Sequence, residues 1–292
     1  MAATPPVRAS LKVLIPLSAV MLLFTGFSLF GVPSFAHGVE FSLFTTTRLP
    51  EHNNNKTGEH FLTHRRKTAP FWLYQGLHTI PAVMWSVMIP LQHMDSFRKK
   101  YPTFHRTAGY LILSGSLVLS LSGLSFLILK HAHSHPNVFH LHDLNGWAAP
   151  FKWPTFEIVL YFLAPPYWLT LYKTAVTARA KDFVNHRKWA VLHTIVASVI
   201  SMERVSMVGS LAFGVTLRMF PKDKVHEFFQ VPQTVAAMAA AELDMFAFIN
   251  IFALGGVMAW MYYEFRRAGF FKGVMDYLSS TAPSQTFAKK VV

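Results

Sequence analysis

One mostly apolar stretch, from Asp182 to Met207, carries several ionisable residues. It holds His186, His193 and the adjacent pair Glu203 and Arg204. A helix turns about 100° per residue, so His186 and Arg204 lie about five turns apart on one face, with His193 within about 20° of that line. Ionisable side chains are costly inside a membrane, and there they pair with one another or form functional sites. The spacing therefore predicts a helix that carries polar groups through an apolar layer.

An outer cluster is expected at one side of that layer. It consists of His78, Glu203, Arg204, Glu242 and Asp244. Two interpretations stay open: a self-neutralising network that fixes helix packing, or a polar cavity that binds a small ligand or relays protons. The set has three acids and one histidine for a single arginine, which is more than a neutralised pair requires. The cavity therefore stays as a hypothesis beside the structural network.

An inner cluster is expected at the opposite side. It consists of His93, His105, His186 and His193. Paired neutral imidazoles ligate b-type haem, so binding of haem b is one hypothesis for this cluster. The alternative is that these side chains cap helices and extend their polar ends to the membrane interface. His78 and His193 are the two deepest histidines, but they lie in different halves of the layer and are not expected to hold one iron together.

A histidine-rich loop, HAHSHPNVFHLHD, contains a third group. Its candidate ligands are His131, His133, His135, His140, His142 and Asp143. Imidazole and carboxylate suit zinc or copper, so a transition-metal site is a hypothesis here, and a solvated loop is the alternative. The chain has no cysteine, which excludes thiolate nucleophiles and cysteine-held metal centres. No nucleophile elbow or phosphate-binding glycine loop stands out, so the question of enzymatic activity stays open.

Long apolar runs must position these groups. Hydrophobic residues make up 52% of the 292 residues and charged residues only 14%, against about 25% in a typical soluble domain. Because a span needs about 20 mostly apolar residues, the pattern predicts an all-α integral membrane bundle of about six transmembrane helices. The spans are expected at Leu11–Val32, Phe71–Gln92, His105–Leu129, Trp153 or Pro154 to Tyr172, from after Asn185 to Leu217, and Val235–Tyr263.

The distribution of positive charge predicts the topology. Of the 27 Lys and Arg residues, sixteen lie beside the termini and the even-numbered loops, which favours both termini in the cytoplasm. Membrane topology and anionic lipids account for the net charge of +13, so the lipid bilayer is the expected partner and nucleic acid is not. The oligomeric state and the identity of the membrane stay open.

Four regions follow from this topology. They are an N-terminal span (1–36), a polar non-cytoplasmic loop (37–70), a five-span membrane domain (71–264) and a basic cytoplasmic tail (265–292). A cleaved signal peptide is the alternative for the first region. The sequon Asn55-Lys56-Thr57 favours a loop that faces a lumen or the exterior.

Two motifs carry a resemblance to a known family. The first combines His78, the basic loop Phe97–Lys100, and His105-Arg106-Thr107-Ala108-Gly109 at the start of the next span. The second opens with Asp182 and His186-Arg187-Lys188-Trp189 and places an arginine, residue 204, deep in the following span. Together they resemble the predicted multi-pass membrane proteins of the domain of unknown function 2306 family, over roughly residues 71–214. The resemblance implies a multi-span membrane fold and no established activity.

A more distant likeness is to six-span di-haem membrane proteins of the cytochrome b type. Those proteins use histidines on four successive central spans, which would imply haem b as the cofactor. Here the expected fourth span, from Pro154 to Tyr172, contains no histidine. The sequence departs from the di-haem pattern at that span.

Overall fold

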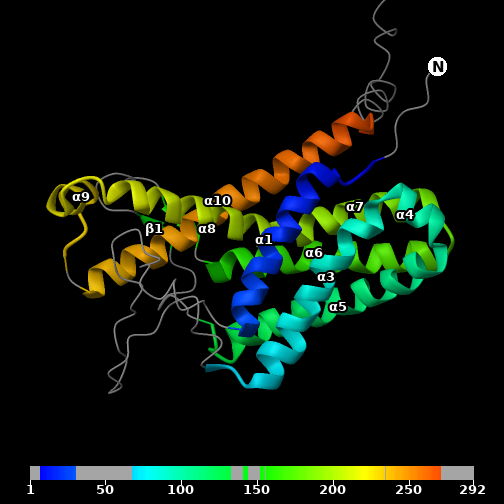
Figure 1. Cartoon of the computed structure of the whole chain (residues 1–292), viewed down its shortest axis with the longest axis horizontal. Coiled ribbons are helices and arrows are strands. Elements are labelled where there is room, and N and C mark those ends of the chain that lie inside the picture. Colours follow the sequence, from blue (N-terminus) through cyan, green and yellow to red (C-terminus); the bar gives the residue numbers. More distant parts are fainter. Residues whose placement is uncertain are drawn as a thin grey trace, which may run out of the picture.

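The computed structural model describes residues 7–30, 68–132, 141–143, 152–154, 156–233 and 235–270, without the side chains of 141–143, 152–154, 156, 211 and 235–247. Within these ranges the chain is helical apart from one short strand pair (Figure 1). The elements are α1 (Leu11–Phe30), the π-helix η3 (Trp72–Thr79), α3 (Ile80–His93), α4 (Asp95–Lys100), α5 (Pro102–Ile128), β1 (Leu141–Asp143), β2 (Lys152–Pro154), α6 (Phe156–Arg179), α7 (Phe183–Ala197), α8 (Val199–Leu217), α9 (Lys222–Phe229) and α10 (Val235–Arg267).

Three helical segments are long and apolar enough to cross a membrane. They are α1, α5 and the run Phe183–Leu217 that α7 and α8 form together. The prediction of a helical chain with membrane-spanning segments is confirmed to this extent, and it indicates a membrane location.

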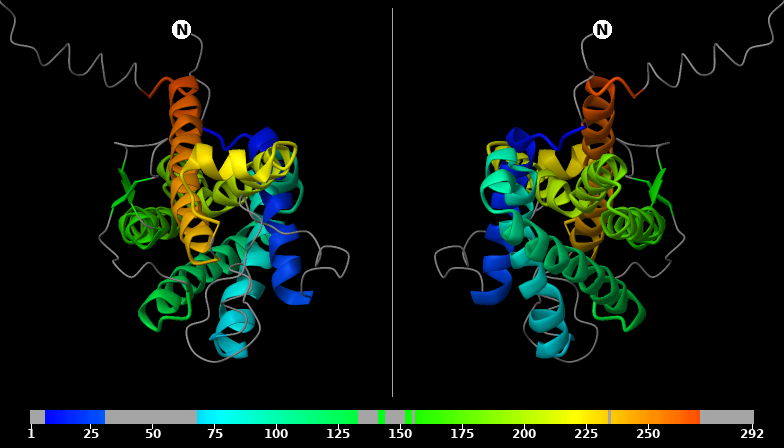
Figure 2. Two further views of the ribbon diagram at one scale, coloured as in Figure 1. Left: turned by 90° about the vertical axis from the view of Figure 1, so that its left-hand side faces the viewer. Right: turned by 90° about the vertical axis from the view of Figure 1, so that its right-hand side faces the viewer.

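The helices pack into a bundle in which neighbours along the chain lie side by side. Helix α6 packs chiefly on α7, α3 on α5 and α1, and α8 on α10 and α1. Figures 1 and 2 show α10 extending beyond the other helices at the end where the N-terminus lies. The core between α1, α3, α5, α7, α8 and α10 includes the buried side chains of Leu14, Trp85, Ile112, Ile195 and Trp260.

A buried carboxylate fastens the start of α1 to α10. Glu264 is 1% exposed, and its Oε1 accepts the backbone N–H of Ser10 at 3.0 Å and the indole N–H of Trp260 at 3.2 Å. Arg267 Nη2 lies 3.8 Å from the other carboxylate oxygen. The first backbone N–H groups of a helix lack partners within it and favour negative charge, so this contact stabilises the N-terminus of α1.

The predicted fourth span begins and ends differently in the structure. Lys152–Pro154 pair with Leu141–Asp143 as antiparallel strands, so the helix starts at Phe156 and not at Trp153 or Pro154. It then continues past Tyr172 to Arg179, through Pro165 and Pro166. Lys181, at φ 57°, makes the turn into α7, and left-handed residues commonly end helices in this way.

The first turn of α7 is capped by Asp182. Its Oδ1 accepts the backbone N–H of Asn185 at 3.2 Å, and its Oδ2 accepts the Asn185 side-chain amide at 2.6 Å. These bonds, first of all that from the Asn185 side chain, lower the pKa of the Asp182 carboxyl. The cap explains why the helix begins at Phe183, before the predicted start of the fifth span.

The helix face expected to run from His186 to Arg204 is not continuous. A turn at Ser198 separates α7 from α8, and the Ser198 hydroxyl donates to the Thr194 carbonyl at 2.7 Å. Such back-bonding by serine bends helices. Helix α7 consequently faces α6, while α8 faces α1 and α10.

Candidate functional site

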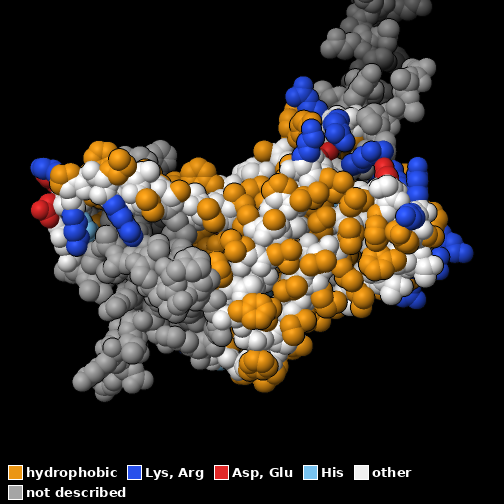
Figure 3. All heavy atoms as spheres, viewed as in Figure 1, with side chains coloured by type: hydrophobic (Ala, Val, Ile, Leu, Met, Phe, Trp, Pro, Cys, Tyr) orange, Lys and Arg blue, Asp and Glu red, His pale blue; other side chains and the backbone are white. Residues whose placement is uncertain are grey.

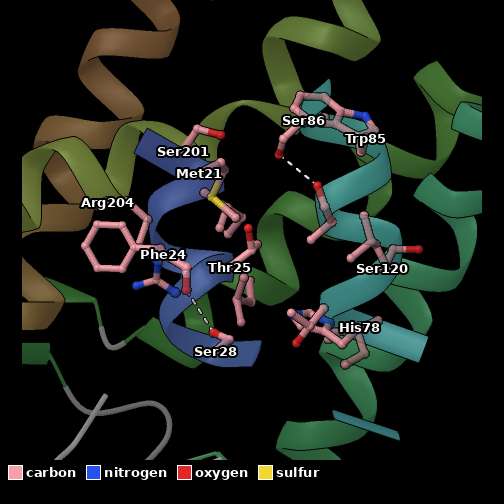
Figure 4. Close-up of a pocket in the computed structure, with 18 of the residues that line it drawn as sticks. Met21, Phe24, Thr25, Ser28, His78, Trp85, Ser86, Ser120, Ser201 and Arg204 are labelled. Carbon is pink, nitrogen blue, oxygen red and sulfur yellow. Dashed lines mark hydrogen bonds between the residues drawn. The ribbon is translucent and has the colours of Figure 1, made fainter. Parts of the chain in front are cut away.

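A cavity of about 250 Å³ lies between α1, η3, α3, α5, α6 and α8 (Figure 4). Its polar lining consists of Thr25, Ser28, Tyr74, His78, Thr79, Ser86, Ser120, Tyr167, Ser201 and Arg204. Most of the remaining wall is apolar and includes Met21, Phe24, Trp85, Leu160 and Leu163. A mostly apolar wall with a few convergent polar groups is typical of a small-molecule site.

Arg204 and Ser201 form one side of the cavity, together with Phe24 of α1 (Figure 4). Arg204 Nη1 donates to Oε1 of Glu203 at 2.9 Å, and the carboxylate is fully buried. The guanidinium also lies over the Phe24 ring, 5.7 Å from its centroid. The arginine is therefore oriented by a buried countercharge on its own helix and by an aromatic face on α1.

His78 lies on the other side of the cavity, on the π-helix η3 (Figure 4). Its Nδ1 is 2.9 Å from the hydroxyl oxygen of Ser122 on α5, and its ring meets Phe126 edge-on at 4.9 Å. The Ser122 hydroxyl is in turn within donating distance of the Leu77 carbonyl, at 3.2 Å, and of the Leu119 carbonyl on its own helix, at 3.1 Å. This chain of contacts fits an imidazole that donates from Nδ1 to Ser122.

Pro81 explains why the helix is irregular at this point. In a regular α-helix the N–H of residue 81 would bond the carbonyl of Leu77, and proline has no such hydrogen. The Ser122 hydroxyl lies within donating distance of the Leu77 carbonyl instead, and the Thr79 hydroxyl donates to the Tyr74 carbonyl at 2.9 Å. A π-helical turn is stabilised in this way inside an apolar layer, where unsatisfied backbone groups are costly.

The outer cluster is only partly described. His78 and Arg204 lie on the wall of one cavity, and Glu203 is bonded to Arg204 behind it. Glu242 and Asp244 are on α10, and their side chains are outside the described set. That the cavity is a functional site stays a prediction.

The inner histidines connect neighbouring helices. His93 Nε2 is 2.9 Å from the Thr194 hydroxyl, and His193 Nδ1 is 3.1 Å from that of Thr170 on α6. His186 Nδ1 donates to the Thr174 carbonyl at 3.0 Å. These contacts join α3 to α7 and α7 to α6, so at least three of the four histidines support helix packing.

Two buried imidazole nitrogens have no hydrogen-bond partner among the described residues: Nδ1 of His105 and Nε2 of His193. His193 also meets the ring of Tyr167, a cavity residue, edge-on at 4.9 Å. None of the inner histidines is part of the cavity wall. Haem binding by the inner cluster stays a prediction that this geometry neither requires nor contradicts.

Metal binding by the histidine-rich loop also stays a prediction. His133, His135 and His140 lie outside the described residues, and His142 and Asp143 belong to β1, whose side chains are not described. The backbone carbonyl of His131 accepts the Thr68 hydroxyl at 2.9 Å. Within the described part of the chain, no three His, Asp or Glu side chains are placed to hold one metal ion. Asn55, in the predicted sequon, is outside the described residues.

Several cavity residues are not recognisable as site residues in the sequence. Thr25, Ser28, Ser120 and Ser201 all lie in apolar runs. Small hydroxyl residues serve helix packing in lipid as often as they line a site, so the sequence gives no signal that separates the two roles. Glu203 and Arg204, by contrast, were visible as charges within a span.

No protein-family profile, no curated protein and no solved structure matches this chain.

Proposed function

We propose that the chain is a multi-pass membrane protein with six transmembrane segments and that its cavity binds a small ligand within the membrane. The segments are α1, η3 with α3, α5, α6, α7 with α8, and α10. Both termini are placed in the cytoplasm by the distribution of Lys and Arg. The likeness to the domain of unknown function 2306 family agrees with such a fold.

The outward-facing side chains support α6 and α10 as spans, two helices that length and hydropathy alone do not identify. Helix α6 exposes Phe162 and Leu169, and α10 exposes Phe252 and Met258. A band of hydrophobic side chains covers the visible face between ends that carry Lys and Arg (Figure 3). Apolar patches of this extent are unusual on soluble monomers and suit contact with lipid.

One observation carries the ligand proposal: a single cavity receives both Arg204 and His78, from helices far apart in the sequence. A purely structural ion pair needs no such space beside it. A dry cavity of about 150 Å³ is known to admit benzene, so about 250 Å³ suits a fused two-ring molecule. The proposed ligand is therefore small, with an apolar body and at least one polar group.

Equilibrium binding to the protein in lipid nanodiscs tests the proposal. The probes are radiolabelled methyl naphthyl ketone and naphthoate, two molecules of similar size, with empty nanodiscs subtracted. Ala82 lines the cavity, and Ala82→Leu fills part of the space that the probe needs. We expect saturable binding of at least one probe to the wild type and at least about tenfold weaker binding to Ala82→Leu.

Val87→Leu is the matched control, because Val87 is on the same helix and 49% exposed. It should bind the probe as the wild type does. Saturable binding that Ala82→Leu leaves unchanged, or no saturable binding of either probe, would overturn the proposed function.

A further inference from the structure

The hydrogen-bond donors of the cavity are unevenly distributed. The hydroxyls of Thr25, Ser28 and Ser86 all donate to carbonyls of their own helices, at 3.0, 3.0 and 2.7 Å. Tyr167 donates to the Ser116 carbonyl at 3.0 Å. These four groups therefore offer the cavity their oxygens and not their hydrogens.

Arg204 and Ser201 differ from that pattern. Glu203 occupies Nη1 of Arg204, while Nη2 and Nε have no hydrogen-bond partner among the described residues. The Ser201 hydroxyl has none either within the described chain, although Ser201 is 2% exposed. The two residues are three positions apart on α8 and so share a helix face. Figure 4 shows both on one side of the cavity, with the Ser201 hydroxyl above and the Arg204 guanidinium lower, beside Phe24.

Among the described residues, the charge at this side of the cavity is already paired. Arg204 is the one Lys, Arg, Asp or Glu among the described residues of the cavity wall, and the buried Glu203 carboxylate neutralises it at 2.9 Å. A carboxylate ligand here would leave one negative charge uncompensated in an apolar region, which is strongly unfavourable. A carbonyl or ether oxygen would accept the same hydrogen bonds without that cost.

We infer that the cavity selects an uncharged, mainly apolar molecule whose carbonyl-type oxygen accepts a hydrogen bond from Nη2 or Nε of Arg204. This inference rests on the proposed function and adds the chemical class of the ligand. The apolar body of the ligand packs toward Trp85, Leu160 and Leu163. Anionic amphiphiles such as free fatty acids are excluded by Glu203, the countercharge of the arginine.

The two probes used above test this inference in the wild-type protein. Binding is measured at about pH 8, above the ordinary range of histidine titration. We expect methyl naphthyl ketone to bind at least about tenfold more tightly than naphthoate.

Glu203→Gln is the more specific test of the preference for an uncharged ligand, because it removes the countercharge and keeps the side-chain volume. The ratio of ketone affinity to naphthoate affinity should fall at least about tenfold in this variant. Equal or tighter binding of naphthoate by the wild type would overturn the inference and leave the proposed function intact. A wild type that binds neither probe would overturn both, and the wild-type comparison stands even if Glu203→Gln does not fold.

Discussion

At the scale of single residues, the Glu203–Arg204 pair dominates the energetics of the site. Both side chains are withdrawn from solvent, with exposures of 0% and 15%. Removing one member of a buried ion pair leaves a charge without its counterpart, which costs more than the intact pair contributes. The sequence revealed these two charges, but not that the guanidinium would lie over the Phe24 ring, because nothing local links residue 24 to residue 204.

The pair therefore predicts a non-additive effect on stability. Arg204→Gln should lower the free energy of unfolding by about 3–5 kcal/mol, because Glu203 loses its countercharge. The double variant Glu203→Gln/Arg204→Gln should recover most of that loss. Reversible unfolding in mixed detergent micelles measures both.

The matched control is an exposed ion pair on α9. Lys224 Nζ lies 2.8 Å from Oε2 of Glu227, and the two side chains are 73% and 70% exposed. Lys224→Gln should therefore change the free energy of unfolding by less than about 1 kcal/mol. Additive losses from Glu203→Gln and Arg204→Gln would contradict the account of the buried pair.

At the scale of elements, the π-helix η3 positions His78. Pro81 leaves the Leu77 carbonyl without its usual donor, and Ser122 of α5 supplies one. The proline was visible in the sequence, but the π-helix was not, because its stability depends on a hydroxyl more than forty residues away. The turn at Ser198 is a similar case, since periodicity alone predicts an unbroken helix from His186 to Arg204.

A double-variant cycle tests this account of η3. Ser122→Ala removes the donor to Leu77 and the partner of His78, and it should cost about 1–2 kcal/mol, the upper range for hydrogen bonds between helices in membranes. Pro81→Ala in that background restores a backbone N–H for Leu77 and should recover at least about half of the loss. Unfolding in mixed micelles is again the measurement.

Ser125→Ala is the control for the cycle, because Ser125 bonds only to the Ser122 carbonyl on its own helix, at 2.7 Å. Its effect should stay below that of Ser122→Ala. If Pro81→Ala has the same effect with and without Ser122, the proposed link between the proline and the π-helix is wrong.

At the scale of the whole molecule, helix content and apolar spans were predictable because they follow from composition and from run length. The ends of the spans were less predictable. Strand β2 occupies the expected start of the fourth helix, and its pairing with β1, a short way back along the chain, cannot be read from hydropathy. The proposed topology places α4 and α9 on opposite sides of the membrane. The two helices also lie at opposite ends of the structure (Figure 1). Both helices carry lysines, so the distribution of positive charge alone is a poor predictor of the side of the membrane that each helix faces.

Single cysteines can establish this topology, because the natural chain has none. Lys100→Cys on α4 should react with a membrane-impermeant maleimide only from the cytoplasmic side, and Lys224→Cys on α9 only from the opposite side. Labelling in intact cells and in opened cells distinguishes the two. Reaction of both from one side would rule out the six-span arrangement.

The central claim is that the cavity between His78 and Arg204 holds a ligand inside the membrane. Photolabelling with a diazirine derivative of methyl naphthyl ketone, followed by peptide mapping, tests it most directly. The account predicts adducts on Met21–Ser28 of α1 and near Ser201 of α8, with loss of both under excess unlabelled ketone and in Ala82→Leu. Adducts spread over outward-facing residues such as Phe162 and Phe252, insensitive to competitor, would contradict it.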